Sequence, residues 1–508
     1  MLQIARRPGA DQLTIALPAL LAAGLCAIEL STRSLWLDEG ATVAIASQHG
    51  SALWQAIAHD GGNMFAYYLL MHVVIVLFGD GAAVIRLPSV IAEAATAGLV
   101  AALALRLFAD RRIALSAGAL TAVSLPLVFW GQDARGYALM AALGAGSFLA
   151  LTAILQAPPD GRPSRAAVAA YVLTTLAALY VGFDAILLVP AQLLLLVVFR
   201  DHARVVVGAV ATVAVLSVPL LVMALSRGSG QLFWVPKLSG GVLGQAALTL
   251  ASAGLTPNFH ETATSTAVAV ITGVVLVAAL VAGVRLLRRD DSAGRALLVP
   301  SCWLLVPAIL GLVAALAGEP LELSRSAVLL IPALALLLGW GLCHPRLPRG
   351  AGVATIAALL ALRALQLAPT YGTSPENWRA AAGYVLAATR SDPTCVAFYP
   401  EDGRMPFDYY VPHDSEAGLI PVLPATPWSQ VKPYVERYQP LGAGIAARCP
   451  RLWLIASHQG QLSGPPASRR DYARYQRLVA ELRGLYGTPT LRHFGYAAQV
   501  RVYRFHQG

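Results

Sequence analysis

The chain has 508 residues, of which 57% are hydrophobic and only 13% are charged, whereas roughly 25% of residues are charged in an average soluble protein. This composition excludes a soluble globular protein and indicates a polytopic α-helical membrane protein. The formal net charge is +10, but the basic residues fall in short segments between apolar runs, which favours lipid head groups over nucleic acid as their partner.

The first apolar run covers residues 14–30 and follows Arg6 and Arg7. Because this run is longer than the apolar core of a signal peptide and has no small-residue cleavage site, we expect a retained signal anchor. Together with later runs of spanning length it predicts eleven transmembrane helices. They lie near residues 12–30, 87–107, 113–130, 136–156, 166–182, 184–200, 205–225, 263–284, 296–316, 326–343 and 351–369.

A further apolar run, 64–79, has only 16 residues, and its placement decides the topology. If it does not span and the N-terminus is cytoplasmic, the inner side holds fifteen arginines, against seven basic residues on the outer side. Because cytoplasmic loops carry the excess of Lys and Arg, this arrangement is favoured. We therefore expect 64–79 to be a juxtamembrane or re-entrant element within a long outer loop, 31–86, and we expect an outer C-terminus.

Residues 370–508 have ordinary polarity and alternate between helix-like and strand-like segments. Helices are expected over 377–389 and near 468–485, and strands over 395–399, over 452–456 and around Val500, Val502 and Phe505. This mixture predicts a small extracytoplasmic α/β domain that follows a transmembrane domain of residues 1–369. Cys395 and Cys449 both lie in it, and a disulfide between them stays open, since it requires an oxidising compartment.

Asp38 and Glu39 follow the first predicted span directly, in the segment Trp-Leu-Asp-Glu-Gly at residues 36–40. The predicted topology places both carboxylates at the outer membrane surface. Two acidic side chains are costly to hold close together there unless they bind a cation or take up a proton. The pair is therefore either a catalytic centre or an interfacial helix cap beside an aromatic anchor, Trp36.

A second polar group consists of Asp133, Arg135 and Tyr137, at the outer ends of the third and fourth predicted spans. It is either a polar turn whose arginine reaches lipid phosphates or part of a site. Arg86 and Arg325 begin the second and tenth spans, also on the outer side. Outer arginines oppose the topology bias, and a cluster of them suits bidentate binding of a phosphate.

Other motifs of known chemistry are missing from the sequence. It has no glycine-rich phosphate loop, no HExxH zinc helix and no GxSxG nucleophile elbow, and its five cysteines lack metal-ligand spacing. Trp234 lies in the second long outer loop, 226–262, where an aromatic side chain is either an interfacial anchor or a stacking surface for a sugar.

Six elements follow one another along the chain: Trp-x-Asp-Glu at 36–39, the tyrosine-rich helix at 66–79 with Tyr67, Arg-Leu-Pro-Ser at 86–89, Ala-Arg-x-Tyr-Ala-Leu at 134–139, Trp-x-Pro at 234–236 and Arg325. In this order they resemble the C-type fold (GT-C) glycosyltransferases that use polyprenyl-phosphate sugar donors, in particular bacterial members of the protein O-mannosyltransferase and aminoarabinose transferase superfamily. The sequence departs from the pattern of that family at three places: a histidine is missing within 180–184, Gly-Gly-Asn replaces proline at 61–63, and Ser326 stands where tyrosine is usual.

The resemblance implies an inverting displacement. Asp38 would be the general base on an acceptor hydroxyl, with a raised pKa beside an ionised Glu39. Arg135 and Arg325 would stabilise the departing polyprenyl phosphate, and Glu39 or Asp133 would orient hydroxyl groups. The residues expected to bind substrate or the donor phosphate are Arg86, Asp133, Arg135, Tyr137, Arg325, Tyr67 and Trp234.

The resemblance also implies a place in the bacterial cytoplasmic membrane, with the site and the C-terminal domain on the periplasmic side. The expected partners are the donor, membrane lipids and a glycan, lipid or protein acceptor. No metal-ligand set is visible, and a divalent cation such as Mg²⁺ or Mn²⁺ is not uniformly needed by these enzymes. The alternatives are a secondary transporter or flippase, which needs broken helices and polar groups at the membrane midplane, and a non-catalytic assembly or sensor protein.

Overall fold

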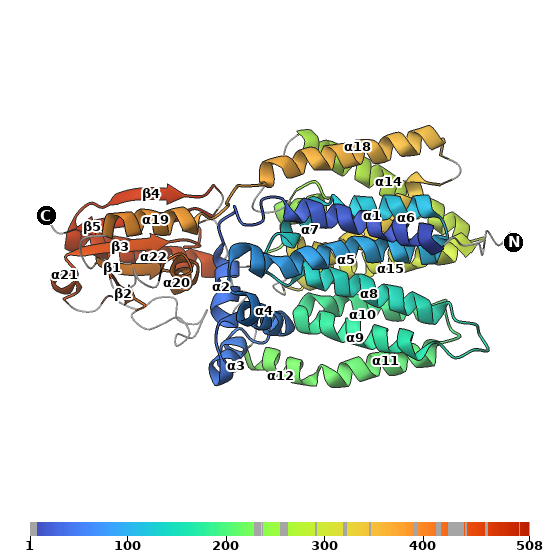
Figure 1. Ribbon diagram of the computed structural model, residues 1–508, viewed down its shortest axis with the longest axis horizontal. Helices are drawn as coiled ribbons and strands as arrows, with labels where there is room; N and C mark the ends of the chain where they lie inside the picture. The colour runs from blue at the N-terminus through green and yellow to red at the C-terminus, as the bar shows by residue number, and fades with distance from the viewer. Residues whose placement is uncertain are drawn as a thin grey trace.

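The computed structural model describes residues 8–227, 235, 237–254, 263–289, 292–318, 323–344, 347–389, 394–412, 418–424, 441, 444–462, 466–496 and 498–506. A bundle of helices forms one part of the molecule, and a unit built around a five-stranded sheet forms the other (Figure 1). This architecture confirms the predicted fold class, a mostly helical membrane protein with a C-terminal α/β unit.

The helical part runs from α1 to η5, and most of its helices are apolar along their whole length. Its elements are α1 Pro8–Ala27, α2 Leu37–Ala46, α3 Gly50–His59, α4 Phe65–Phe78, α5 Ala82–Phe108, α6 Arg111–Ala122, α7 Leu125–Gly131, α8 Tyr137–Leu155, α9 Arg165–Val181, η1 Phe183–Leu187, α10 Leu188–Leu194, η2 Leu195–Val197, α11 Ala203–Leu216, α12 Val218–Arg227, α13 Gly240–Leu250, α14 Ala263–Leu287, α15 Ser292–Leu316, α16 Leu323–Ser326, η4 Ala327–Leu330, α17 Ile331–Leu342, α18 Arg349–Leu367 and η5 Ala368–Thr370.

Each of the eleven expected spans is helical, but not all are long enough to cross a membrane by themselves. Within the described residues, six helices meet the length and hydropathy criteria, or up to eight if each of two bent pairs is one span. The bends are 60° between α6 and α7 and 45° between α11 and α12. The expected spans at 166–182, 184–200 and 326–343 correspond to shorter apolar helices.

Helix α4 covers most of the short apolar run at 64–79. Its 14 residues correspond to a length of about 21 Å, which is less than the roughly 30 Å of a bilayer's hydrocarbon core. Figure 1 shows α2, α3 and α4 together at the end of the bundle that faces the sheet unit. α4 is therefore too short to cross a bilayer by itself. It lies beside α2, where the sequence predicts a juxtamembrane element.

The C-terminal unit contains a mixed sheet with the strand order β2-β1-β3-β5-β4. β1 runs parallel to β2 and β3, whereas β5 is antiparallel to β3 and β4. The structure joins Cys395 and Cys449 by a disulfide. The elements are α19 Trp378–Thr389, β1 Thr394–Tyr399, η6 Glu401–Gly403, α20 Arg404–Asp408, β2 Leu419–Leu423, α21 Ile445–Arg448, β3 Arg451–Ala456, α22 Pro466–Tyr486, β4 Thr490–Phe494 and β5 Val500–His506.

The two faces of the sheet are covered by different helices. Alternate residues of a strand point to opposite faces, so Ala397 of β1 packs in one cluster with Leu478 and Leu482 of α22. Val396, the preceding residue, packs in a second cluster with Trp378 of α19. Because both faces are covered, β1 and β3 are apolar almost throughout rather than alternating.

The sheet unit is hydrogen-bonded to the segment between α1 and α2. Arg379 donates to the carbonyls of Ser31 and Thr32, and the Ser34 backbone N–H donates to the Ser374 hydroxyl at 2.8 Å. Further along, a Cβ added to Gly40 in α2 would lie 2.7 Å from the backbone of Pro406 in α20. Only glycine permits so close an approach without a shift of the neighbouring chain.

Candidate active site

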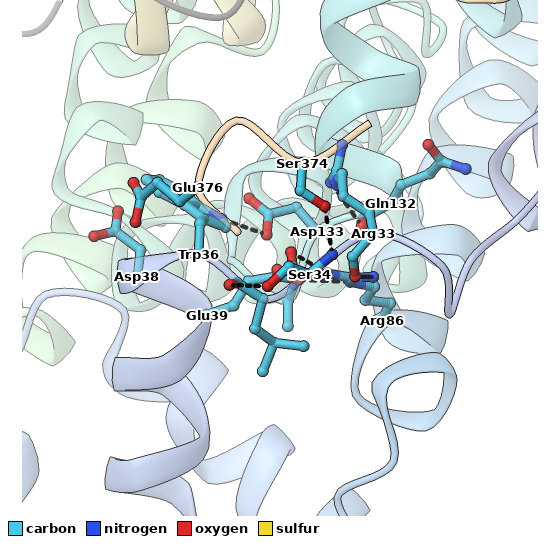
Figure 2. A network of polar contacts seen from close by, with 12 residues as sticks. Arg33, Ser34, Trp36, Asp38, Glu39, Arg86, Gln132, Asp133, Ser374 and Glu376 are labelled. Atoms are coloured by element: carbon cyan, nitrogen blue, oxygen red, sulfur yellow. Dashed lines mark hydrogen bonds and ion pairs between the residues drawn. The ribbon is translucent and has the colours of Figure 1, made fainter. Parts of the chain in front are cut away.

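The two adjacent acids of α2 have different surroundings. Asp38 and Glu39 lie in the first turn of α2, and consecutive helical residues point about 100° apart, so they do not share a face. Figure 2 shows Asp38 pointing away from the group of contacts drawn around Glu39. Each carboxylate must therefore be considered separately.

Asp38 lies between two arginines contributed by distant segments. Its Oδ2 is 3.2 Å from Nη1 of Arg325 and 3.8 Å from Nη2 of Arg135. The same Nη1 of Arg325 lies 3.2 Å from the hydroxyl of Tyr137. The side chains of Asp38 and Arg325 are each 23% exposed, whereas Arg135 and Tyr137 are buried, so solvent reaches the group at Asp38 and Arg325. The structure thus brings together four of the residues singled out from the sequence.

The predicted raised pKa of Asp38 is wrong. Burial favours the neutral acid, but the charges of Arg135 and Arg325 outweigh burial and hold the pKa of this carboxyl below its ordinary value. Asp38 is therefore a carboxylate at neutral pH. The expectation rested on an ionised Glu39 beside Asp38, whereas two guanidinium groups lie within 4 Å of the Asp38 carboxylate.

Glu39 forms a closed ion pair with Arg86. Its two carboxylate oxygens accept from Nε and Nη2 of Arg86 at 2.7 and 2.6 Å, and Oε1 also accepts from the Ala134 backbone N–H. The remaining guanidinium contacts go to the carbonyls of Leu30, Arg33 and Ser34. Burial disfavours ionisation, but Arg86 overcomes it and lowers the pKa of Glu39.

This enclosure corrects two expectations. Neither Glu39 nor Arg86 has any exposed surface, so Glu39 cannot touch an acceptor hydroxyl and Arg86 cannot receive a donor phosphate. Their contacts instead join the start of α5, the segment before α2 and the turn at Ala134. The pair is a positioning element that fixes the Asp38 turn against Arg135.

Asp133 is equally enclosed, and Figure 2 shows it between Trp36 and the segment that carries Arg33. Its Oδ1 accepts from Nε1 of Trp36 at 2.9 Å, and its Oδ2 has no donor among the described residues. Burial and the charge of Glu39 raise the pKa of Asp133 well above its ordinary value. A neutral carboxyl that is 0% exposed holds Trp36 and does not reach a sugar, contrary to the expectation for this residue.

Arg135 and Arg325 are held in place by further polar contacts. Arg135 donates to the Tyr68 hydroxyl, which in turn donates to Asp60 at 2.8 Å. Next to Arg325, the Ser326 hydroxyl donates to Asp184 at 2.7 Å. Asp184 at the break after α9 thus fixes the short helix that presents Arg325.

Of the remaining two expected residues, the structure describes one, Tyr67, which does not join the site. Tyr67 is fully buried, with its hydroxyl 3.4 Å from that of Ser89, so it packs inside the bundle instead of facing a donor. Trp234 lies outside the described residues. Within those residues, no three histidine, cysteine or acidic side chains converge as they would around a metal ion.

Two residues near Asp38 were not predicted from the sequence. His458 follows β3, and its Nε2 lies 2.6 Å from Oε1 of Glu376. Oε2 of Glu376 accepts from the backbone N–H of Leu37, the residue before Asp38. The Ser-Pro-Glu segment at 374–376 was recognisable only as the start of a helix, and nothing in the sequence links His458 to a residue 420 positions earlier.

No protein-family model matches the chain, and no curated protein matches it in sequence. The structure is similar to that of ArnT from Cupriavidus metallidurans bound to undecaprenyl phosphate, with a TM-score of 0.58, 14% identity and 98% of each chain covered. The chain has the C-type glycosyltransferase fold. ArnT in the apo state matches with a TM-score of 0.57, 15% identity and the same coverage.

A second solved structure has the same fold in a longer chain. The archaeal oligosaccharyltransferase AglB from Archaeoglobus fulgidus, in complex with an inhibitory peptide and a dolichol-phosphate, matches with a TM-score of 0.50 and 12% identity. The match covers 88% of this chain and 69% of AglB. At such low identity these likenesses establish the fold and leave the activity to be argued from the site.

Proposed function

We propose that this protein is an integral membrane glycosyltransferase that moves a sugar from a polyprenyl-phosphate donor to an acceptor hydroxyl. The observation that carries the proposal is the position of Asp38 between Arg135 and Arg325, in a fold shared with a structure that holds undecaprenyl phosphate. A carboxylate beside two guanidinium groups offers a proton acceptor and a phosphate-binding surface within one site.

The reaction follows from these groups. The acceptor oxygen attacks the anomeric carbon, the bond from that carbon to the phosphate oxygen breaks, and the configuration inverts in a single displacement. Negative charge develops on the departing phosphate, where Arg135 and Arg325 stabilise it. The hydroxyl proton goes to Asp38. Because the pKa of Asp38 is low, it takes the proton late, when bond formation has already made the hydroxyl acidic.

Donor binding also tunes the base. In the structure the charge of Arg325 is directed at Asp38 and at the Tyr137 hydroxyl. A phosphate that enters beside this guanidinium shares its charge, which weakens the hold on Asp38 and raises the basicity of the carboxylate. The site therefore becomes a better base once the leaving group is in place.

We further propose that the reaction occurs on the periplasmic side of a bacterial cytoplasmic membrane, in the synthesis of an envelope glycan, lipopolysaccharide or glycoprotein. The arginine distribution of the sequence supports this topology. The disulfide between Cys395 and Cys449 supports it independently, because disulfides persist in oxidising compartments. Residues 370–508 would then form the extracytoplasmic domain and residues 1–369 the transmembrane domain.

The test is mass spectrometry of envelope glycans, lipids and glycoproteins from a strain that lacks the gene. We expect one sugar to be missing, to return with the wild-type gene, and to stay missing with an Asp38→Ala variant present at wild-type level. An unchanged set of envelope sugars, together with uptake of a small anion or lipid-linked substrate into vesicles, would overturn the proposal in favour of a transporter or flippase.

A further inference from the structure

Glu376 links the C-terminal unit to the turn that carries Asp38. Its Oε2 accepts from the backbone N–H of Leu37 at 3.1 Å and from Nε1 of Trp378 at 2.8 Å, and its Oε1 lies 2.6 Å from Nε2 of His458. Glu376 is 2% exposed, whereas 36% of the His458 side chain remains exposed. A buried carboxylate therefore orients an accessible imidazole at the junction of the two parts of the molecule.

Hydrogen bonds on both sides of His458 hold the loop that follows β3. The Ser457 backbone N–H donates to the Tyr399 carbonyl at 3.0 Å, and the Gln461 backbone N–H donates to the Ser468 hydroxyl at 2.9 Å. His458 itself has a φ of +51°, which is uncommon for a residue other than glycine. Such conformations persist only where the surroundings enforce them, and they gather at functional sites.

Resting on the proposed function, we propose that His458, oriented by Glu376, is a further catalytic residue that receives the acceptor proton from Asp38. The proton leaves the acceptor hydroxyl as its oxygen bonds to the anomeric carbon, resides on Asp38, and passes to the neutral imidazole. The electron pair of the broken bond departs with the phosphate. The imidazolium then gives its proton to water, which returns the site to its starting state.

The chemistry of the neighbours favours this direction of transfer. Asp38 is held ionised by Arg135 and Arg325, and the carboxylate that contacts His458 also accepts from the backbone N–H of Leu37, the residue before Asp38. An imidazole is intrinsically a far better proton acceptor than a carboxylate that two guanidinium groups hold ionised. The carboxylate of Glu376 stabilises the resulting imidazolium.

Other charged groups surround the same loop. Glu376 is the carboxylate in contact with the imidazole, and Asp38, which follows the Leu37 N–H that Glu376 binds, contacts the two arginines. The loop also packs on the start of α22, where the backbone of Ser468 would meet a Cβ placed on Gly460. This stretch of α22 also carries Arg469, Arg470 and Asp471.

The experiment measures kcat and KM between about pH 5 and 8 for the full chain in lipid nanodiscs, using a panel of synthetic polyprenyl-phosphate hexose and pentose donors and gene-deletion membranes as acceptor. We expect the wild-type rate to fall on the acid side as His458 becomes protonated. His458→Gln should lower kcat by about 10²–10³-fold, leave the donor KM unchanged and remove this fall.

Three further variants separate chemistry from structure. Glu376→Gln should move the acid fall to lower pH, because the imidazolium loses its stabilising charge. Added imidazole should partly restore His458→Ala, since the imidazole site is accessible. His493→Gln, an exposed histidine on β4, should behave as wild type. Melting temperature and undecaprenyl-phosphate binding verify that each variant is folded.

The outcomes distinguish this inference from the function on which it rests. If the wild type transfers sugar while folded His458→Gln retains its rate and pH profile, the role of His458 is overturned and the glycosyltransferase proposal stands. If His458→Ala is inactive but added imidazole has no effect and Glu376→Gln leaves the profile unchanged, His458 is structural. If the wild type transfers sugar from no donor of the panel, the proposed function itself is overturned.

Discussion

Arg325 and Asp38 lie 287 residues apart in the chain, and Nη1 of the arginine is 3.2 Å from Oδ2 of the aspartate. The same guanidinium is stacked 5.5 Å from the ring of Trp36, the residue that Asp133 holds. Helix α16, which carries Arg325, thus meets the start of α2 directly. An arginine that is already paired with the base has to share its charge with any phosphate that enters beside it.

Replacement of Arg325 tests this sharing. Arg325→Ala should lower kcat for sugar transfer by about 10²–10³-fold, because the developing phosphate charge loses a preorganised donor. Arg325→Lys should restore part of the rate, since it keeps the charge but not the planar fork. Lys237→Ala is the control, as an exposed basic side chain outside the site. Equal activity of the Ala variant and this control would remove Arg325 from the mechanism.

The sequence was sufficient for part of this geometry and insufficient for the rest. Asp38, Arg135, Tyr137 and Arg325 all lie at helix ends on the predicted outer side, and helix ends on one side of a bundle meet. The roles of Glu39 and Arg86 did not follow, because a sequence does not tell which of two adjacent helical acids faces an enclosed arginine. The side chains around Asp38 therefore set its pKa in a direction opposite to the prediction.

The fold, too, could be predicted only in part from the sequence. The expected strands at 395–399 and 452–456 lie within β1 and β3, whose continuous apolar runs are typical of strands buried on both faces. β4 was not predicted, because its residues are exposed and show no alternation. The contact of Glu376 with the backbone of Leu37 depends on docking between the two parts of the molecule, which no local pattern encodes.

The Glu39–Arg86 pair should be essential for stability. Arg86→Met leaves a buried carboxylate without its partner, which costs about 3–5 kcal/mol, and should lower the melting temperature of the detergent-solubilised protein sharply. Glu39→Gln should be milder, because the amide oxygen still accepts one hydrogen bond. Arg111→Met breaks a pair that is 41% and 30% exposed and should cost about 0–1 kcal/mol. Similar losses for both pairs would contradict the positioning role.

Asp133 should behave as a neutral group. Its folded-state pKa lies above the ordinary value near 3.8, so wild-type stability should decline as the pH rises from that value towards the raised pKa. Asp133→Asn keeps an acceptor for Trp36 and has no charge to bury. We therefore expect it to match the wild type at low pH and to gain relative stability towards neutral pH.

Thermal unfolding between about pH 4 and 8 measures this difference, with Asp133→Ala as the variant that loses the acceptor for Trp36. A melting temperature of Asp133→Asn that lies as low as that of Asp133→Ala at every pH would show that Asp133 is needed as a carboxylate.

The docking of the C-terminal unit should depend on Gly40. A Cβ at this position would lie 2.7 Å from Pro406, so Gly40→Ala must push α20 away from α2, at a cost of about 1–3 kcal/mol. We expect faster limited proteolysis between α18 and α19 and slower sugar transfer. Gly24→Ala meets nothing within 4 Å and serves as the control. Equal proteolysis rates for both variants would contradict the close contact.

The most direct test of the central claim compares the wild type, Asp38→Asn and Asp80→Asn in sugar transfer from labelled polyprenyl-phosphate donors to deletion-strain membranes. Asp80 is an exposed acid on the loop between α4 and α5. We predict that Asp38→Asn folds and binds undecaprenyl phosphate but transfers sugar at least about 10³-fold more slowly, while Asp80→Asn matches the wild type. A folded Asp38→Asn enzyme with the wild-type transfer rate would contradict the account.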